Sequence, residues 1–295
     1  MSNLDWDRLF CFVDDFCKEF EPHWFKTLLV TRERIRRREV LSLSEVMTLV
    51  IAFHYSKVRT FKAFYLQAQT FHGELFPGIV SYSHFVTLMT MALIPLLAFL
   101  KTHTAECMGV SIIDSTPIMA CHNKRIFSHK VFEGIAKRGK STMGYFFGFK
   151  LHLIINEVGE LLAFKITPGN AGDTKVVSEL SKDLVGKLFG DKGCISSKLF
   201  KELFKRGLKL VTQLRAKMKP KPMEFTDRII LRKRSLVEST NHILKDVLQV
   251  EHTRHRSPIG FMINMLSGLA AYVLYDHKPQ MRMEFKDSMQ KMLPA

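Results

Sequence analysis

The spacing of the apolar residues changes near residue 105, and this change constrains the fold more than any other feature of the sequence. Before it, apolar residues recur at intervals of three and four, as in residues 4–20 and 60–71, which is typical of amphipathic helices. After it, short apolar runs such as residues 108–113 are typical of buried strands. We therefore expect an all-α helical region at residues 1–105, an α/β domain at residues 106–280 and a C-terminal tail at residues 281–295.

The second region predicts strands and helices in a mixed order. Strand-like runs at residues 145–155 and 161–166 are separated by a polar, glycine-containing segment, which predicts a hairpin. Asp173 is expected to be the N-cap of the amphipathic helix that follows it. The other expected elements are strands at 187–190 and 209–214 and helices at 173–184, 196–206, 234–248 and 259–275. This order predicts a mixed α/β fold.

The helical region carries clear start signals for two of its helices. Ser42 followed by Glu45 is a capping-box signature and predicts a helix to about residue 54. Ser81 or Ser83 is expected to cap a long apolar helix that ends near residue 102. Five arginines precede the capping box: Arg32, Arg34, Arg36, Arg37 and Arg38. Short helices beside a basic cluster fit a helix-turn-helix DNA reader, and a bundle whose arginines face solvent fits the same pattern.

The net charge indicates a polyanionic partner. The chain has 44 Lys and Arg against 28 Asp and Glu, which gives a net charge of +16 and a pI near 9.7. Such an excess favours nucleic acid or an acidic membrane surface. The longest apolar run, residues 88–100, contains a proline and is shorter than the roughly 20 residues of a membrane span, so it predicts a buried helix. The acidic N-terminus does not resemble a signal peptide. The 5 cysteines form no CxxC pair, which favours free thiols in a reducing cytoplasm.

Three acidic residues carry the candidate chemistry. Asp114 and Asp191 each follow a short apolar strand directly, and functional groups collect at the carboxyl ends of strands in α/β sheets. Glu238 lies on an expected helix. Arg234 and Lys245 fall on the same helix face, because spacings of four and seven residues are near whole turns. Three converging carboxylates suit a divalent cation, since Mg²⁺ prefers oxygen ligands.

Each of these acids also has an ordinary structural explanation. An Asp after a strand is often a turn residue or a helix cap, and Glu238 beside Arg234 can be a surface ion pair. The conjunction of all three in a basic chain favours a metal site. Two Mg²⁺ ions about 3.5–4 Å apart, or Mn²⁺ in their place, would serve phosphoryl transfer. Arg234 and Lys245 would then contact the phosphates of the cleaved strand.

Further cationic residues are candidates for contact with a DNA backbone. Lys150 shares a strand face with His152, and a solvated face explains that pair equally well. The residues around Gly139 predict a basic loop, for which phosphate contact and simple exposure are the alternatives. His252 and His255 leave a histidine metal site open. The candidates are Lys137, Arg138, Lys140, Lys150, Lys192, Arg254 and Arg256, together with Arg234 and Lys245.

The spacing of Arg234, Glu238 and Lys245 resembles a signature of the DDE transposases of bacterial insertion sequences. In many of those enzymes three residues separate the Arg from the Glu, six separate the Glu from the Lys, and a Tyr precedes the Arg by three. Leu231 occupies the tyrosine position here. Other matching segments are Ile113-Asp114-Ser115-Thr116-Pro117, Gly148-Phe149-Lys150-Leu151-His152, Thr167-Pro168-Gly169-Asn170 and Asp191-Lys192-Gly193. Together the matching segments cover residues 108–275.

The resemblance implies a ribonuclease-H-like mixed-sheet core in which Asp114, Asp191 and Glu238 hold the metal ions. It implies nicking at the ends of a mobile element and attack of the freed 3′-hydroxyl on target DNA. The implied partners are double-stranded DNA of the terminal inverted repeats and of the target. A homodimer is expected, because two ends must be brought together. The resemblance also implies a bacterial, cytoplasmic, nucleoid-associated enzyme. The Asp191–Glu238 interval, 238 − 191 = 47 residues, is too short for a large inserted domain.

Three other functions fit the same residues less well. A catalytically inactive DNA-binding protein of this fold would have no need for three converging acids. A ribonuclease-H-like nuclease acting in repair or on RNA would lack inverted repeats around its gene. A basic peripheral membrane protein would bind liposomes in a salt-dependent way.

Overall fold

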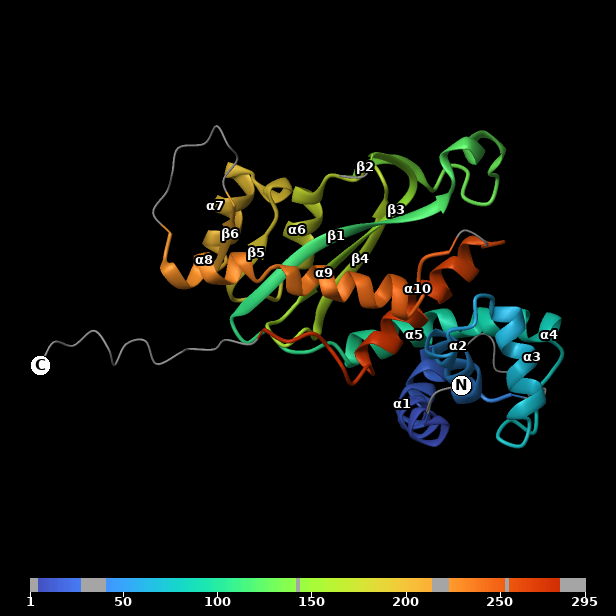
Figure 1. The fold of residues 1–295 in the computed structure, drawn as a ribbon. Coiled ribbons are helices and arrows are strands. Elements are labelled where there is room, and N and C mark those ends of the chain that lie inside the picture. The colour runs from blue at the N-terminus through green and yellow to red at the C-terminus, as the bar shows by residue number, and fades with distance from the viewer. Residues whose placement is uncertain (1–4, 28–40, 142–143, 214–222, 253–254, 282–295) are drawn as a thin grey trace, which may run out of the picture.

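The computed structural model describes residues 5–27, 41–141, 144–213, 223–252 and 255–281. The arginine cluster at residues 32–38 and the tail from residue 282 onward therefore lie outside the described residues, as does the candidate Arg254. The described part consists of a group of N-terminal helices followed by a twisted sheet with helices on both faces (Figure 1).

The helical region forms from the signals that the sequence contains. Ser42 and Glu45 make both hydrogen bonds of a capping box at the start of α2, and Ser81 caps α4. The expected helices are confirmed, although a short 3₁₀ turn interrupts the long apolar one. The elements are α1 (Trp6–Thr27), α2 (Leu43–Tyr55), α3 (Phe61–Phe71), α4 (Tyr82–Leu88), η1 (Met89–Ala92) and α5 (Leu93–Thr102).

One helical stretch among the described residues, Tyr82–Thr102, is long and apolar enough to cross a membrane by length and composition. Its inner side packs against α10 and α2, where Leu96, Phe99 and Leu100 are completely buried. The sequence predicts a buried helix at residues 88–100, and this is confirmed for one side of the helix, whereas Met91, Ile94 and Leu97 are exposed on the other.

Six strands form one mixed sheet, which confirms the mixed α/β fold and the five strands that the sequence predicts and adds β2. Its order is β2-β3-β1-β5-β6, and β4 pairs with the second half of β3, which begins after the residues that pair with β2. The pairs β1–β3, β2–β3 and β3–β4 are antiparallel, whereas β1–β5 and β5–β6 are parallel. The strands are β1 (Val110–Cys121), β2 (Lys137–Ser141), β3 (Gly144–Ile155), β4 (Leu161–Pro168), β5 (Gly186–Gly190) and β6 (Leu208–Thr212).

Helices cover both faces of this sheet. One face is covered by α6 and α7, which pack on side chains such as Ile113 and Leu188. The opposite face is covered by α8 and α9, which pack on Ile112 and Phe189, and by α10 together with the N-terminal helices. The elements are α6 (Asp173–Leu180), α7 (Ser197–Lys205), α8 (Phe225–Arg232), α9 (Ser235–His242), η4 (Ile243–Val247) and α10 (Pro258–Val273). The sequence predicts each of these helices except α8.

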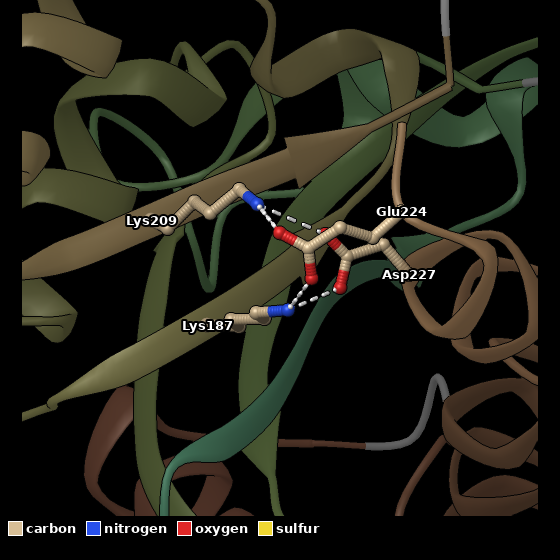
Figure 2. Close-up of polar contacts among 4 residues, drawn as sticks. All are labelled: Lys187, Lys209, Glu224 and Asp227. Carbon is tan, nitrogen blue, oxygen red and sulfur yellow. Dashed lines mark hydrogen bonds and ion pairs between the residues drawn. The ribbon is translucent and has the colours of Figure 1, made fainter. Parts of the chain in front are cut away.

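An ion cluster fixes α8 to the start of the parallel strands (Figure 2). Asp227 of α8 is 1% exposed and accepts hydrogen bonds from Lys187 of β5 at 2.7 Å and Lys209 of β6 at 3.1 Å. Glu224 binds the same two lysines at the surface. The cluster lies at the opposite end of β5 from Asp191, so it sets the position of the helices that lead to Glu238.

Candidate active site

Asp114 lies in the middle of β1, not at a strand end as the sequence predicts. β5 pairs with β1 only as far as Ile112, whereas β3 continues to pair as far as Cys121. The residues after Asp114 are therefore extended and form no turn in the described sheet. A proline is tolerated at position 117 because its backbone polar groups face away from β3. Its carbonyl oxygen accepts a hydrogen bond from Lys245 on that side of β1. The N–H of a residue points to the same side of a strand as its carbonyl, so the N–H that proline lacks would not have bonded to β3.

The other two acids come from neighbouring elements. Asp191 directly follows β5, as the sequence predicts, and its side chain is 54% exposed. Because β5 is the parallel neighbour of β1, the end of β5 brings Asp191 close to Asp114. Glu238 lies on α9, which packs against β1, and its side chain is 62% exposed.

One guanidinium group joins the three acids. Arg234 Nη1 lies 3.9 Å from Asp114 Oδ1 and 3.5 Å from Asp191 Oδ1, while Nη2 lies 3.6 Å from Glu238 Oε1. The arginine side chain is only 18% exposed. The three carboxylates therefore surround one positive charge, at the mouth of a cleft of about 520 Å³ that they line together.

The chemistry of this group of residues fits a divalent cation. Carboxylate oxygens are the ligands that hard cations prefer, and Arg234 already collects three of them around a positive charge. Asn241 adds a buried Oδ1 that has no hydrogen-bond partner among the described residues. In the described residues no three acids, histidines or cysteines are arranged to hold an ion directly. An ion at this point therefore requires the Arg234 side chain to move aside.

The carboxyl group of Asp114 has a raised pKa. Its pKa lies at about 6 instead of 3.8, mainly because the group is buried, and the negative charges of Asp191 and Glu238 act in the same direction. Arg234 and the backbone N–H of Ser115 act in the opposite direction. This carboxyl group holds its proton more tightly than an exposed one, so protonation competes with a bound cation as the pH falls toward 6.

Two residues position β1 and α9 relative to each other. Asn241 Nδ2 donates a hydrogen bond to Asp114 Oδ2 at 3.1 Å. Lys245 donates to the carbonyl oxygen of Pro117 and forms a 2.9 Å ion pair with Glu251. Sequence reasoning missed Asn241, although its position three residues after Glu238 on the same helix face is a usable signal. The ammonium group of Lys245, predicted to contact DNA, is held within the fold in this arrangement.

Asp173 is not the helix cap that the sequence predicts. Gly172 occupies the N-cap position of α6, and Asp173 is the first residue of the helix. Its Oδ1 accepts a hydrogen bond at 3.1 Å from Lys150, which also donates to the carbonyl oxygen of Ala171. His152 is buried beside them and binds Thr167, and burial lowers its pKa to about 4. Lys150, His152 and Asp173 line the same cleft as the three acids.

The other cationic candidates lie around the cleft. The residues around Gly139 form β2 and not the expected loop, because the start of β3 pairs with them. Lys140 lines the cleft, and Lys192 follows Asp191 in η3 (Lys192–Cys194). The ring of His255 stacks on His252 at 3.8 Å, and burial lowers the pKa of His255 to about 3. The exposed candidates are Lys137, Arg138, Lys140, Lys192 and Arg256.

Comparisons with known proteins agree with this arrangement. Residues 104–258, more than half of the chain, match the family model described as the transposase DDE domain. The fold is similar to that of a piggyBac transposase, solved by cryo-electron microscopy as a synaptic complex with hairpin DNA. The TM-score is 0.50 at 12% identity, and the match covers 83% of this chain and 70% of that chain. Comparison with curated protein sequences gave no match.

These comparisons confirm the predicted ribonuclease-H-like core with a helical region before it. Enzymes of the matched family cut and join DNA and use divalent metal ions. The mixed sheet, the acids around Arg234 and the matched family model lead to one conclusion. The chain belongs to the DDE transposase family and is a DNA transposase.

Proposed function

We propose that Asp114, Asp191 and Glu238 are the catalytic acids and that they hold two Mg²⁺ ions, for which Mn²⁺ can substitute. The observation that carries the proposal is the convergence of the three acids on Arg234 within 3.9 Å. Bound divalent ions would neutralise charge at the scissile phosphate and favour the ionised form of the attacking oxygen. The reaction is cleavage at the ends of an insertion sequence, followed by joining of the 3′-hydroxyl to target DNA.

The chain's own residues orient the reacting groups. Asn241 fixes the rotamer of Asp114 through its 3.1 Å hydrogen bond, and Lys245 holds the segment of β1 that follows it. Arg234 supplies a guanidinium group that can pair with a phosphate oxygen once its carboxylate partners are occupied. Phosphoryl transfer of this kind depends on positioning and charge neutralisation, so the protein needs no covalent nucleophile.

We propose that the DNA backbone is bound by the cations around the cleft and by Arg234 and Lys245. Lys137, Arg138 and Lys140 on β2 are exposed, as is Lys192 beside Asp191. The net charge of +16 supports the same interaction. Lys150 contributes mainly through Asp173, to which its ammonium group is bound. Arg256, which is exposed, is proposed to contact the DNA as well, and so is Arg254, which lies outside the described residues.

We further propose that the chain acts as a homodimer on two inverted-repeat ends, in the bacterial cytoplasm next to the nucleoid. In this proposal residues 1–105 contact DNA, residues 106–280 carry catalysis and residues 281–295 form a tail. Joining requires two ends in one complex, which supports the dimer. The family assignment supports the DNA partners.

Cleavage of labelled DNA that carries the gene's own flanking sequences tests the proposal. We expect discrete nicks with Mg²⁺ or Mn²⁺, no nicks with Ca²⁺ or chelator, and no nicks by Asp114→Asn or Glu238→Gln. An Asp246→Asn variant, which changes an exposed acid outside the cleft, is the matched control and should cleave normally. If the wild type binds this DNA and leaves it intact with every metal, the chain is an inactive DNA-binding protein of the same fold.

A further inference from the structure

A second hollow adjoins the catalytic cleft. Its volume is about 650 Å³, and it lies between η2 (Asn123–Ser128), β2 and the first residues of β3. Lys140, Phe146 and Lys150 line both this hollow and the cleft that holds the three acids. The two spaces therefore adjoin each other along these three residues.

Two exposed aromatic rings are carried by the elements that form this hollow: Tyr145 lines it, and Phe127 directly follows Ile126, which lines it. Phe127 is 92% exposed and Tyr145 is 70% exposed, although most aromatic rings of a folded domain are buried. Both rings are carried by ordered backbone. Asn123 Nδ2 donates to the carbonyl oxygen of Tyr145 at 2.7 Å, which ties η2 to the start of β3.

Each ring lies beside a cation. The guanidinium carbon of Arg138 is 5.6 Å from the centroid of Phe127, and Lys140 Nζ is 5.8 Å from the centroid of Tyr145. Lys140 and Tyr145 are direct cross-strand partners in the β2–β3 hairpin, so their side chains project from the same face. The four residues form a base-stacking platform of two exposed rings with a positive charge at each.

Exposed rings that alternate with cations suit unpaired nucleotides better than a duplex. A duplex backbone needs only the charges, because its bases are stacked on one another. In a single strand the bases can stack on protein rings while the cations contact the phosphates. Three of the four platform residues, Arg138, Lys140 and Tyr145, lie on the β2–β3 hairpin, and Lys140 also lines the catalytic cleft. A strand end freed by cleavage in the cleft would therefore lie close to the platform.

We propose that the platform of Phe127, Arg138, Lys140 and Tyr145 binds unpaired nucleotides at the end of the DNA strand held in the catalytic cleft. This inference rests on the proposed function, because it takes the cleft to be the site of DNA cleavage. The inference names the part of the DNA that the platform recognises, which is a frayed or overhanging single-stranded end. The bases of this end are bound by stacking on the rings, so no particular base sequence is required.

The test compares two forms of one short duplex from the gene's flank, blunt or with a single-stranded overhang that carries 2-aminopurine. The full chain is used with Ca²⁺, and affinity and 2-aminopurine fluorescence are measured. We expect the overhang to bind more tightly than the blunt end and its fluorescence to be quenched. Phe127→Ala and Tyr145→Ala should each weaken overhang binding about tenfold, as expected for loss of one stacked base. Blunt binding should stay unchanged.

The matched control is Phe204→Ala, which removes a ring of similar exposure, 65%, from α7, an element that lines neither space. Tyr145→Phe keeps a ring and should retain overhang binding. The proposal is wrong if blunt and overhanging DNA bind equally, or if the alanine variants weaken both forms to the same extent. Cleavage of DNA by Asp114→Asn would refute the proposed catalytic acids. It would not decide the stacking proposal, which the binding measurements test separately.

Discussion

At Asp114, burial and the positive charge of Arg234 act in opposite directions on the pKa of one carboxyl group. Burial raises its pKa to about 6, while Arg234 stabilises its ionised form. Asn241 donates a hydrogen bond to the same group, so its orientation is fixed before any ligand arrives. An arginine held by three acids keeps mutually repelling carboxylates close together and leaves them ready for a stronger cation.

This orientation predicts a role for Asn241. Asn241→Leu removes the amide donor to Asp114, and we expect single-turnover cleavage to fall about 10- to 100-fold. Affinity for DNA should change little, because Asn241 is buried and lies beneath the acids. Ser239→Ala, on the exposed side of the same helix, is the control. Wild-type cleavage rates in Asn241→Leu, with its fold verified by circular dichroism, would exclude the positioning role.

At the scale of elements, α8 and α9 determine where Glu238 lies. α8 is fixed by Asp227, which is 1% exposed between the ammonium groups of Lys187 and Lys209 (Figure 2). Both lysines are partly exposed, so removal of the buried acid leaves charges that can turn toward water. The stabilisation therefore depends on the hydrogen bonds to a buried carboxylate more than on charge alone.

Asp227→Asn should lower the free energy of unfolding by about 2 kcal/mol, because charge-assisted hydrogen bonds are replaced by weaker ones. Glu224→Gln touches the same lysines from an exposed position and should lower the free energy of unfolding far less than Asp227→Asn does. Urea unfolding of both variants measures the difference. Equal losses in the free energy of unfolding for the two variants would show that the burial of Asp227 adds nothing to its stabilising effect.

The sequence was sufficient for most elements, and the exceptions have physical causes. The run at 108–113 predicts a strand, but its continuation to Cys121 depends on pairing with β3, which is distant in sequence. β2 has a basic sequence with no strand pattern and forms because the start of β3 offers it an open edge. The sequence shows that Arg234 and Glu238 share one helix face. It does not show that Arg234 lies between Asp114 and Asp191, because that contact depends on how the helix packs against the sheet.

At the scale of the whole molecule, one hydrophobic core joins the N-terminal helices to α10 and to one face of the sheet. His54 of α2 lies at this junction and is 2% exposed. Its Nδ1 lies 2.6 Å from the carbonyl oxygen of Leu248, and its Nε2 lies 2.9 Å from Ser267 Oγ. The pKa of His54 is lowered to about 4, mainly by burial. The hydrogen bond to the Leu248 carbonyl partly opposes this shift, and the charge of His252 acts in the same direction as burial.

The buried His54 predicts loss of stability in acid. Below pH 6.5 the unfolded chain binds a proton that the folded protein takes up only near pH 4, so stability is full above pH 6.5 and falls as the pH drops. The contribution of this one residue is about 3 kcal/mol across that range. Urea unfolding at several pH values should give a shallower pH dependence for His54→Gln than for wild type. His84→Gln, at an exposed histidine, should leave it unchanged, and an unchanged slope in His54→Gln would contradict the account.

The account's central claim is that Asp114, Asp191 and Glu238 together hold the divalent metal. Electron paramagnetic resonance of Mn²⁺ titrated into the full chain with bound DNA measures this directly. We predict saturable binding that is weakened at least about tenfold in each of Asp114→Asn, Asp191→Asn and Glu238→Gln, since each substitution removes a charged oxygen ligand. Asp246→Asn should bind Mn²⁺ like the wild type. Wild-type Mn²⁺ affinity in all three site variants would contradict the claim.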